Sequence, residues 1–209
     1  MIELGVIEKA QAQAICDAVK EKEGSTEPIP FNVVADRITA LKVGGGENKL
    51  VQLVEGTLTE ITAKDLEGAT QIKCSIFVGY SSLQRVILPN TITEIDVGAF
   101  ERSGVSYVEI PNSVTLIGTY AFNNCQQLQS AVINGKAGCL QAYRTFSYCP
   151  KLTSVYIGSE ITNINAAFNG CEALTDIYID NPEGSISGAP WGATNATIHW
   201  NTPLPSEED

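Results

Sequence analysis

The chain has few positively charged residues. Its 209 residues include 13 Lys plus Arg against 24 Asp plus Glu, so the formal net charge at pH 7 is −11. Proteins that bind nucleic acids neutralise phosphates with clustered cations, and polybasic segments bind anionic lipids in the same way. We therefore expect no direct binding to DNA, to RNA or to an anionic membrane surface.

Long hydrophobic runs are also absent. Nowhere do about 18 apolar residues follow one another, the length that a transmembrane helix needs. Residues 1–20 contain no basic start followed by a short apolar stretch, which a cleaved secretory signal has. The pattern predicts no membrane insertion and no export by a cleaved signal.

Residues suited to catalysis or metal binding are scarce. The single histidine, His199, has no nucleophile or carboxylate at a recognisable spacing, so we interpret it as an outward-facing strand residue. No CxxC pair suggests zinc, and the carboxylates lack the spacing of a calcium loop. The three glycines at 44–46 are not followed by the GKS or GKT of a phosphate loop. We predict a non-enzymatic protein with no catalytic residues, no cofactor and no metal.

An internal repeat dominates the rest of the sequence. Aromatic residues, here called the marker aromatics, recur every 22 to 24 residues at Phe77, Phe100, Phe122, Phe146, Phe168 and Trp191. A period of this length is typical of a solenoid, in which each unit buries its apolar face only by stacking on its neighbours. Stacked units present an extended surface, so the repeat favours a binding function.

A short alternating segment follows each marker aromatic. Its two apolar positions, separated by one residue, are filled by Val86 and Leu88, Val108 and Ile110, Ala131 and Ile133, Val155 and Ile157, and Ile177 and Ile179. Alternation at period two sends both members of a pair inward. A turn and a second apolar pair, such as Ile92 and Ile95, come next. The pattern predicts one parallel sheet with one strand from each coil, closed behind by a loose second strand.

The six cysteines are compatible with three disulfides or with free thiols. Cys125, Cys149 and Cys171 each lie three residues after a marker aromatic, a repeat position that a small apolar side chain fills. A chain of this length has enough core to need no disulfides. We predict buried free thiols at these positions.

Residues that alternate with the inward pairs must face outward from the strands. They form a candidate binding strip of two rows: Arg85, Ile87, Tyr107, Glu109, Val132, Tyr156 and Tyr178. Neighbouring strands lie about 4.8 Å apart, so Tyr156 and Tyr178 should stack side by side, next to Val132. Aromatic side chains held on a rigid sheet suit binding. The alternative is that these residues are only good strand formers on an exposed face.

The N-terminal part of the chain has a different pattern. Residues 8–41 read as two short helices, and 44–46 as a flexible linker. The apolar face of these helices, which has little to pack against, is a candidate assembly face: Ile15, Val19, Phe31, Val34, Ile38 and Leu41. We expect a helical attachment module at 1–43, a linker and N-terminal cap at 44–71, the repeats with a C-terminal cap at 72–200, and an acidic tail at 201–209. The assembly face could join copies into a homo-oligomer.

Two segments carry the signature of a known repeat. Residues 117–128, IGTYAFNNCQQL, and residues 167–174, AFNGCEAL, resemble the BspA-type leucine-rich repeat in their Ala-Phe pair, their cysteine and the leucine that follows. The unit at Phe146 departs from it with Thr145 in place of alanine, and the unit at Phe100 has Ser103 in place of cysteine. The resemblance implies an α+β protein: a right-handed leucine-rich-repeat solenoid of about five coils after a small helical segment.

A second resemblance concerns residues 14–30. The sequence AICDAVKEKEG followed by TEPIP is similar to a short helical module of tail and other virion proteins of phages and prophages. This resemblance implies a non-enzymatic phage virion protein, bound to other virion proteins through its N-terminal helices, with the repeats contacting a host cell-surface protein or glycan. The alternative is a bacterial cell-surface adhesin of the BspA type. The two hypotheses predict location in the virion or at the bacterial cell surface.

Overall fold

The chain folds into a stack of short strands. The computed structural model describes residue 52 and residues 57–136 and 143–203. The strands in these residues are β1 (Glu60–Ile61), β2 (Gln71–Ile72), β3 (Arg85–Val86), β4 (Glu94–Ile95), β5 (Tyr107–Ile110), β6 (Leu116–Ile117), β7 (Ser130–Ile133), β8 (Ser154–Ile157), β9 (Asp176–Ile179) and β10 (Thr197–Trp200).

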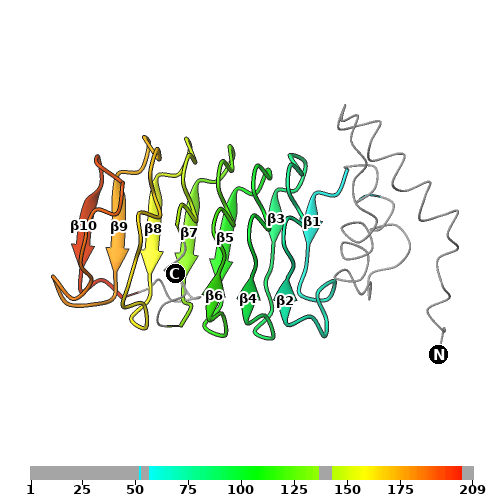
Figure 1. Cartoon of the computed structure of the whole chain (residues 1–209), viewed down its shortest axis with the longest axis horizontal. Helices are drawn as coiled ribbons and strands as arrows, with labels where there is room; N and C mark the ends of the chain where they lie inside the picture. The colour runs from blue at the N-terminus through cyan, green and yellow to red at the C-terminus, as the bar shows by residue number, and fades with distance from the viewer. Residues whose placement is uncertain (1–51, 53–56, 137–142, 204–209) are drawn as a thin grey trace, which may run out of the picture.

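The strands form two parallel sheets, which corrects the prediction of one. The larger sheet has seven strands in the order β1-β3-β5-β7-β8-β9-β10, and the smaller has three in the order β2-β4-β6. Figure 1 shows the seven strands side by side along the long axis, with the three of the second sheet beside them. The second sheet forms because Ile72, Ile95 and Ile117 are buried at the same place in successive coils. Equal coil lengths bring these backbones into register, so the expected loose strands pair.

The marker aromatics form a stack through the core. The rings of Phe77, Phe100, Phe122, Phe146 and Phe168 lie with centroids 5.0 to 6.0 Å apart between neighbours. Each of these side chains is at most 1% exposed, and Trp191 closes the series at 3%. The inward pairs of the strands are buried around the stack as predicted. The end of the predicted C-terminal cap forms β10, which spans Thr197–Trp200.

The three repeat cysteines are buried free thiols, as predicted. Each thiol donates a hydrogen bond to the backbone carbonyl of the phenylalanine one coil earlier: Cys125 to Phe100 at 3.2 Å, Cys149 to Phe122 at 3.2 Å and Cys171 to Phe146 at 3.0 Å. Hydrogen bonds with the thiols of Cys125 and Cys171, together with burial, raise the pKa of Cys149 above its ordinary value. A raised pKa keeps the thiol protonated and unreactive.

Besides the two sheets, the turns on either side of the marker aromatics form backbone hydrogen bonds between neighbouring coils. In the first coil the amides of Ser75, Phe77 and Gly79 donate to the carbonyls of Val97, Ala99 and Glu101 in the next coil, at 2.8 to 3.0 Å. The residues two before and two after a marker repeatedly have positive φ, and those that are not glycine are Ser75, Arg102, Tyr120, Asn124, Arg144, Tyr148 and Ala166. This conformation is costly for such residues. Its recurrence at these two repeat positions indicates that the bonds to the next coil offset the cost.

Close packing of the coils also explains a glycine of the repeat signature. A Cβ atom at Gly118 would lie 2.5 Å from the backbone nitrogen of Val97 in the preceding coil. Gly118 in turn donates its amide hydrogen to the carbonyl of Ile95 at 2.6 Å. Any side chain here would force the two coils apart, so the position requires glycine.

Several predictions concern residues outside the described ranges. The helical segment at 8–41, the linker at 44–46 and the candidate assembly face formed by Ile15, Val19, Phe31, Val34, Ile38 and Leu41 all lie there, as do residues 204–209 of the acidic tail. The segment predicted as an N-terminal cap is described continuously from residue 57. It contains β1 of the larger sheet, and β2 of the smaller sheet begins at its last residue, Gln71.

We expect Phe122→Ala to lower the free energy of unfolding by about 3–5 kcal/mol, because it removes a buried ring and leaves a cavity between two others. Urea denaturation followed by circular dichroism measures this. Leu116→Ala, at a side chain 47% exposed on β6, is the control and should change the free energy by less than about 1 kcal/mol. Equal effects of the two substitutions would contradict the central place of the stack.

Candidate binding surface

The candidate binding strip lies on the outer face of the seven-stranded sheet, in two rows. The first row runs Arg85, Tyr107, Ser130, Ser154, Asp176 and Thr197, each paired in register with the next. The second row runs Glu109, Val132, Tyr156, Tyr178 and His199. Ile87 follows β3 directly and is 38% exposed. The structure thus brings all seven strip residues to one face.

An aromatic stack occupies the end of this face nearest β10. The rings of Tyr156 and Tyr178 are 4.6 Å apart and nearly parallel at 13°, and the imidazole of His199 continues the stack 4.6 Å from Tyr178 at 15°. We call these three residues the outer aromatic stack. Their ring faces cover one another, so the stack presents ring edges and the tyrosine hydroxyls outward. Such groups combine apolar contact area with hydrogen-bonding capacity.

A carboxylate holds the histidine at the end of the stack. Nε2 of His199 lies 2.8 Å from Oδ1 of Asp176 and donates to it, while the hydroxyl of Thr175 donates to Oδ2 at 2.8 Å. These two bonds, that from His199 foremost, lower the pKa of Asp176. Desolvation and the neighbouring charge of Asp176 raise the pKa of Tyr178. The end of the outer face is therefore aromatic, hydroxylated and anionic at neutral pH.

The other end of the outer face carries more charged side chains. Arg85 forms an exposed ion pair with Glu60 at 3.1 Å, a kind of pair that contributes little to stability. The hydroxyl of Tyr107 donates to Glu109 at 3.4 Å. Burial, followed by the charge of Glu109, raises the pKa of Tyr107.

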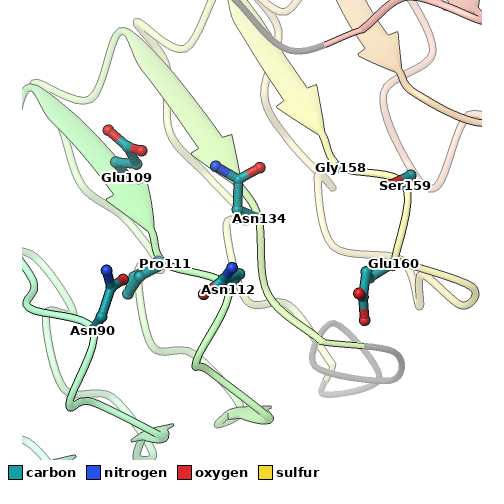
Figure 2. Close-up of a pocket in the computed structure, with 8 residues that line it drawn as sticks. All are labelled: Asn90, Glu109, Pro111, Asn112, Asn134, Gly158, Ser159 and Glu160. Carbon is teal, nitrogen blue, oxygen red and sulfur yellow. The ribbon is translucent and has the colours of Figure 1, made fainter. Parts of the chain in front are cut away.

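Two hollows, each of about 390 Å³, adjoin Glu109. The first lies beside Arg85, Ile87 and Tyr107. The second follows the carboxyl ends of the strands, and Figure 2 shows its lining residues: Asn90, Glu109, Pro111, Asn112, Asn134, Gly158, Ser159 and Glu160. Asn90, Glu109 and Pro111 line both hollows, so we treat them as one groove, the strand-end groove.

Sequence reasoning missed part of this surface. His199 was predicted to face outward, and it does, but its ring also extends the tyrosine stack and pairs with Asp176. The signal was available, because His199 comes 21 residues after Tyr178, close to the coil length. The strand-end groove had a partial signal, because Asn90, Asn112 and Asn134 recur every 22 residues after the strands. No period in the sequence specifies that these turns enclose a hollow.

Neither a metal site nor a membrane span is found in the part of the chain that the structure describes. There, no three His, Cys, Asp or Glu side chains lie where they could hold an ion together. Likewise no helix in these residues has the length and apolar character needed to cross a bilayer.

The repeat signature has a match among known families. The sequence model of the BspA type leucine rich repeat region matches residues 55–175 in six copies, which is more than half of the 209-residue chain. The chain belongs to the BspA-type leucine-rich repeat family. The predicted resemblance is thereby confirmed, and the six copies exceed the five coils expected because the match begins ahead of the first marker aromatic. Residues 14–30, which resemble a phage module, lie outside this match.

Solved structures of two bacterial repeat proteins are similar to the chain. A leucine rich cell surface protein from Faecalibacterium prausnitzii A2-165 shares 16% identity at a TM-score of 0.27, over 73% of this chain and 61% of that one. A leucine-rich repeat protein from Bacteroides ovatus shares 17% identity at a TM-score of 0.30, over 70% of this chain and 55% of that one. This chain thus spans less than two thirds of either protein. No curated protein matches it.

We expect His199→Ala to raise the pKa of Asp176, because the variant loses the strongest hydrogen bond to the carboxylate. Because the pKa of Asp176 is lowered in the folded protein, its hydrogen bond with His199 stabilises the folded state at pH values above the ordinary aspartate pKa. The contribution is lost as the pH falls through the pKa of the folded state. Carbon-13 NMR of the carboxyl group during a pH titration measures the change. Thr175→Val should raise the pKa less, and an unchanged pKa in His199→Ala would contradict the assignment.

Proposed function

We propose that this chain is a non-enzymatic binding module that contacts its partner through the outer face of the seven-stranded sheet. The observation that carries the proposal is the outer aromatic stack, in which two tyrosines and a histidine lie half-buried in a row on the outward side of consecutive strands. Tyrosine is enriched where proteins bind one another, because it offers a large contact area at low entropic cost.

The rigidity of the sheet supports the same proposal. Tyr156 and Tyr178 lie on strands whose inward neighbours, Val155, Ile157, Ile177 and Ile179, are fully buried. Backbone pairing holds these strands in one register. A surface already ordered in the free protein loses little entropy on binding, and this strengthens association.

Display on a bacterial cell surface, as a BspA-like adhesin, is the setting that we favour. Membership in the BspA-type family supports it. The alternative, display on a phage virion, rests on the resemblance of residues 14–30 and has no support from the repeats.

We expect the double variant Tyr156→Ala/Tyr178→Ala to lose most of its binding to cultured epithelial cells, measured by flow cytometry with the fluorescently labelled chain. The wild-type chain should bind, and Leu116→Ala, an exposed apolar change on the other sheet, should bind equally well. Thermal unfolding of all three proteins establishes that they are folded. Wild-type binding that the double variant retains would contradict the placement of the site on the outer face.

We expect the native protein in the envelope fraction of the bacterium that encodes it. Mass spectrometry of envelope, cytoplasm and purified virions from the same culture makes the comparison, with an abundant cytoplasmic enzyme as the control for leakage. Recovery in the virions alone would overturn cell-surface display in favour of the phage alternative.

A further inference from the structure

The strand-end groove is long and open. It begins beside Tyr107 and Ile87, passes Glu109, and continues past Asn112 and Asn134 to Ser159 and Glu160. Its lining comes from four successive coils, because the residues drawn in Figure 2 follow β3 (Asn90), β5 (Pro111 and Asn112), β7 (Asn134) and β8 (Gly158, Ser159 and Glu160). A groove that crosses several coils fits a chain-like ligand better than a compact one.

The groove lining is rich in groups that both donate and accept hydrogen bonds. The amides of Asn90, Asn112 and Asn134 and the hydroxyl of Ser159 can do both, while the carboxylates of Glu109 and Glu160 accept only. Lys136 lies 3.5 Å from Glu160. No lysine, arginine or histidine of the described residues forms a salt bridge with Glu109. These carboxylates, on a chain of net charge −11, repel anionic ligands such as phosphates and acidic sugars.

The hollow beside Ile87 and Tyr107 supplies apolar contacts as well. Tyr107 is 45% exposed and Ile87 is 38% exposed, and the ring of Pro111 adjoins both hollows. A ligand that fits the whole groove therefore needs apolar C–H surface together with a rim of donors and acceptors. A wholly apolar ligand would leave the amides unpaired, which is unfavourable.

We propose that the strand-end groove binds a neutral oligosaccharide. This inference rests on the proposed function, since the groove borders the outer face and shares Tyr107, Ile87 and Glu109 with the candidate binding strip. Hydroxyl groups of a neutral sugar donate to Glu109 and exchange hydrogen bonds with the asparagine amides, and the C–H face packs against Tyr107 and Ile87. The repeating units of an oligosaccharide match asparagines that recur from coil to coil.

Gly158 keeps the β8 end of the groove open. A Cβ atom there would lie 3.0 Å from the amide oxygen of Asn134, tighter than an ordinary contact. The absence of a side chain leaves this amide free to face a ligand.

Isothermal titration calorimetry of the full chain tests the proposal. The probes are four neutral hexasaccharides (cellohexaose, maltohexaose, chitohexaose and mannohexaose) and hexalysine. At least one hexasaccharide should bind, with an affinity that does not change between low and high salt. Asn112→Ala and Asn134→Ala should each weaken that binding by about threefold to tenfold, the value of one or two hydrogen bonds. Asn163→Ala, which removes an exposed amide outside the groove, is the matched control and should bind as the wild type does.

Glu109→Gln separates a neutral ligand from a cationic one. The glutamine retains an oxygen acceptor, so it should weaken hexasaccharide binding less than Glu109→Ala does. Binding of hexalysine alone, abolished by Glu109→Gln and by high salt, would identify a basic peptide as the ligand and overturn the proposal. Absence of binding by all four hexasaccharides would also overturn it. If the epithelial-cell binding that depends on Tyr156 and Tyr178 persists in that case, the proposed function stands and only the ligand class is wrong.

Discussion

The stack of phenylalanine rings sets the geometry on which the rest of the molecule depends. Rings whose centroids lie 5.0 to 6.0 Å apart repeat at nearly the spacing of hydrogen-bonded strands, about 4.8 Å. One ring per coil therefore fills the core without forcing the strands apart or leaving a gap. A coil without its ring would leave a cavity and weaken the contacts on both sides, which is why five successive units carry phenylalanine at the same place and the next carries Trp191.

Three sets of hydrogen bonds enforce the same spacing from other sides of the coil. The seven-stranded sheet holds one side of the coils, and the three-stranded sheet holds a second side from β2 to β6. The turn amides around the marker aromatics hold a third side. The buried cysteines add bonds from their thiols to the phenylalanine carbonyls of the preceding coil. Because the backbone is tied at several points, the unfavourable positive φ of residues such as Tyr120 and Arg144 is tolerated. The result is a scaffold whose outer face is ordered before any partner arrives.

Because residues alternate along each strand, the inward residues stabilise the core and the outward residues are available for binding. Inward residues of β5 to β9 are fully buried, and their immediate neighbours in sequence face outward. Substitutions on the outer face can therefore change what is bound without disturbing the core. The chain uses this freedom unevenly: aromatic rings gather near β10, whereas carboxylates and amides gather around Glu109 and the strand-end groove. One face thus offers two chemically different surfaces, and the proposed saccharide site and the proposed aromatic contact lie on adjacent parts of it.

The sequence by itself determined the solenoid, its inward residues and the strip that faces outward. These features follow from two short-range periods, the coil length and the alternation within a strand, and both can be read without knowing any long-range contact. The stacking of Tyr156 on Tyr178 was predictable for the same reason. Only the tertiary structure decided that the second apolar segments pair into a sheet of their own, that His199 bonds to Asp176, and that the turns after the strands enclose a groove. Those outcomes depend on side-chain directions and on distances between side chains of neighbouring coils, which neither the coil length nor the alternation within a strand specifies.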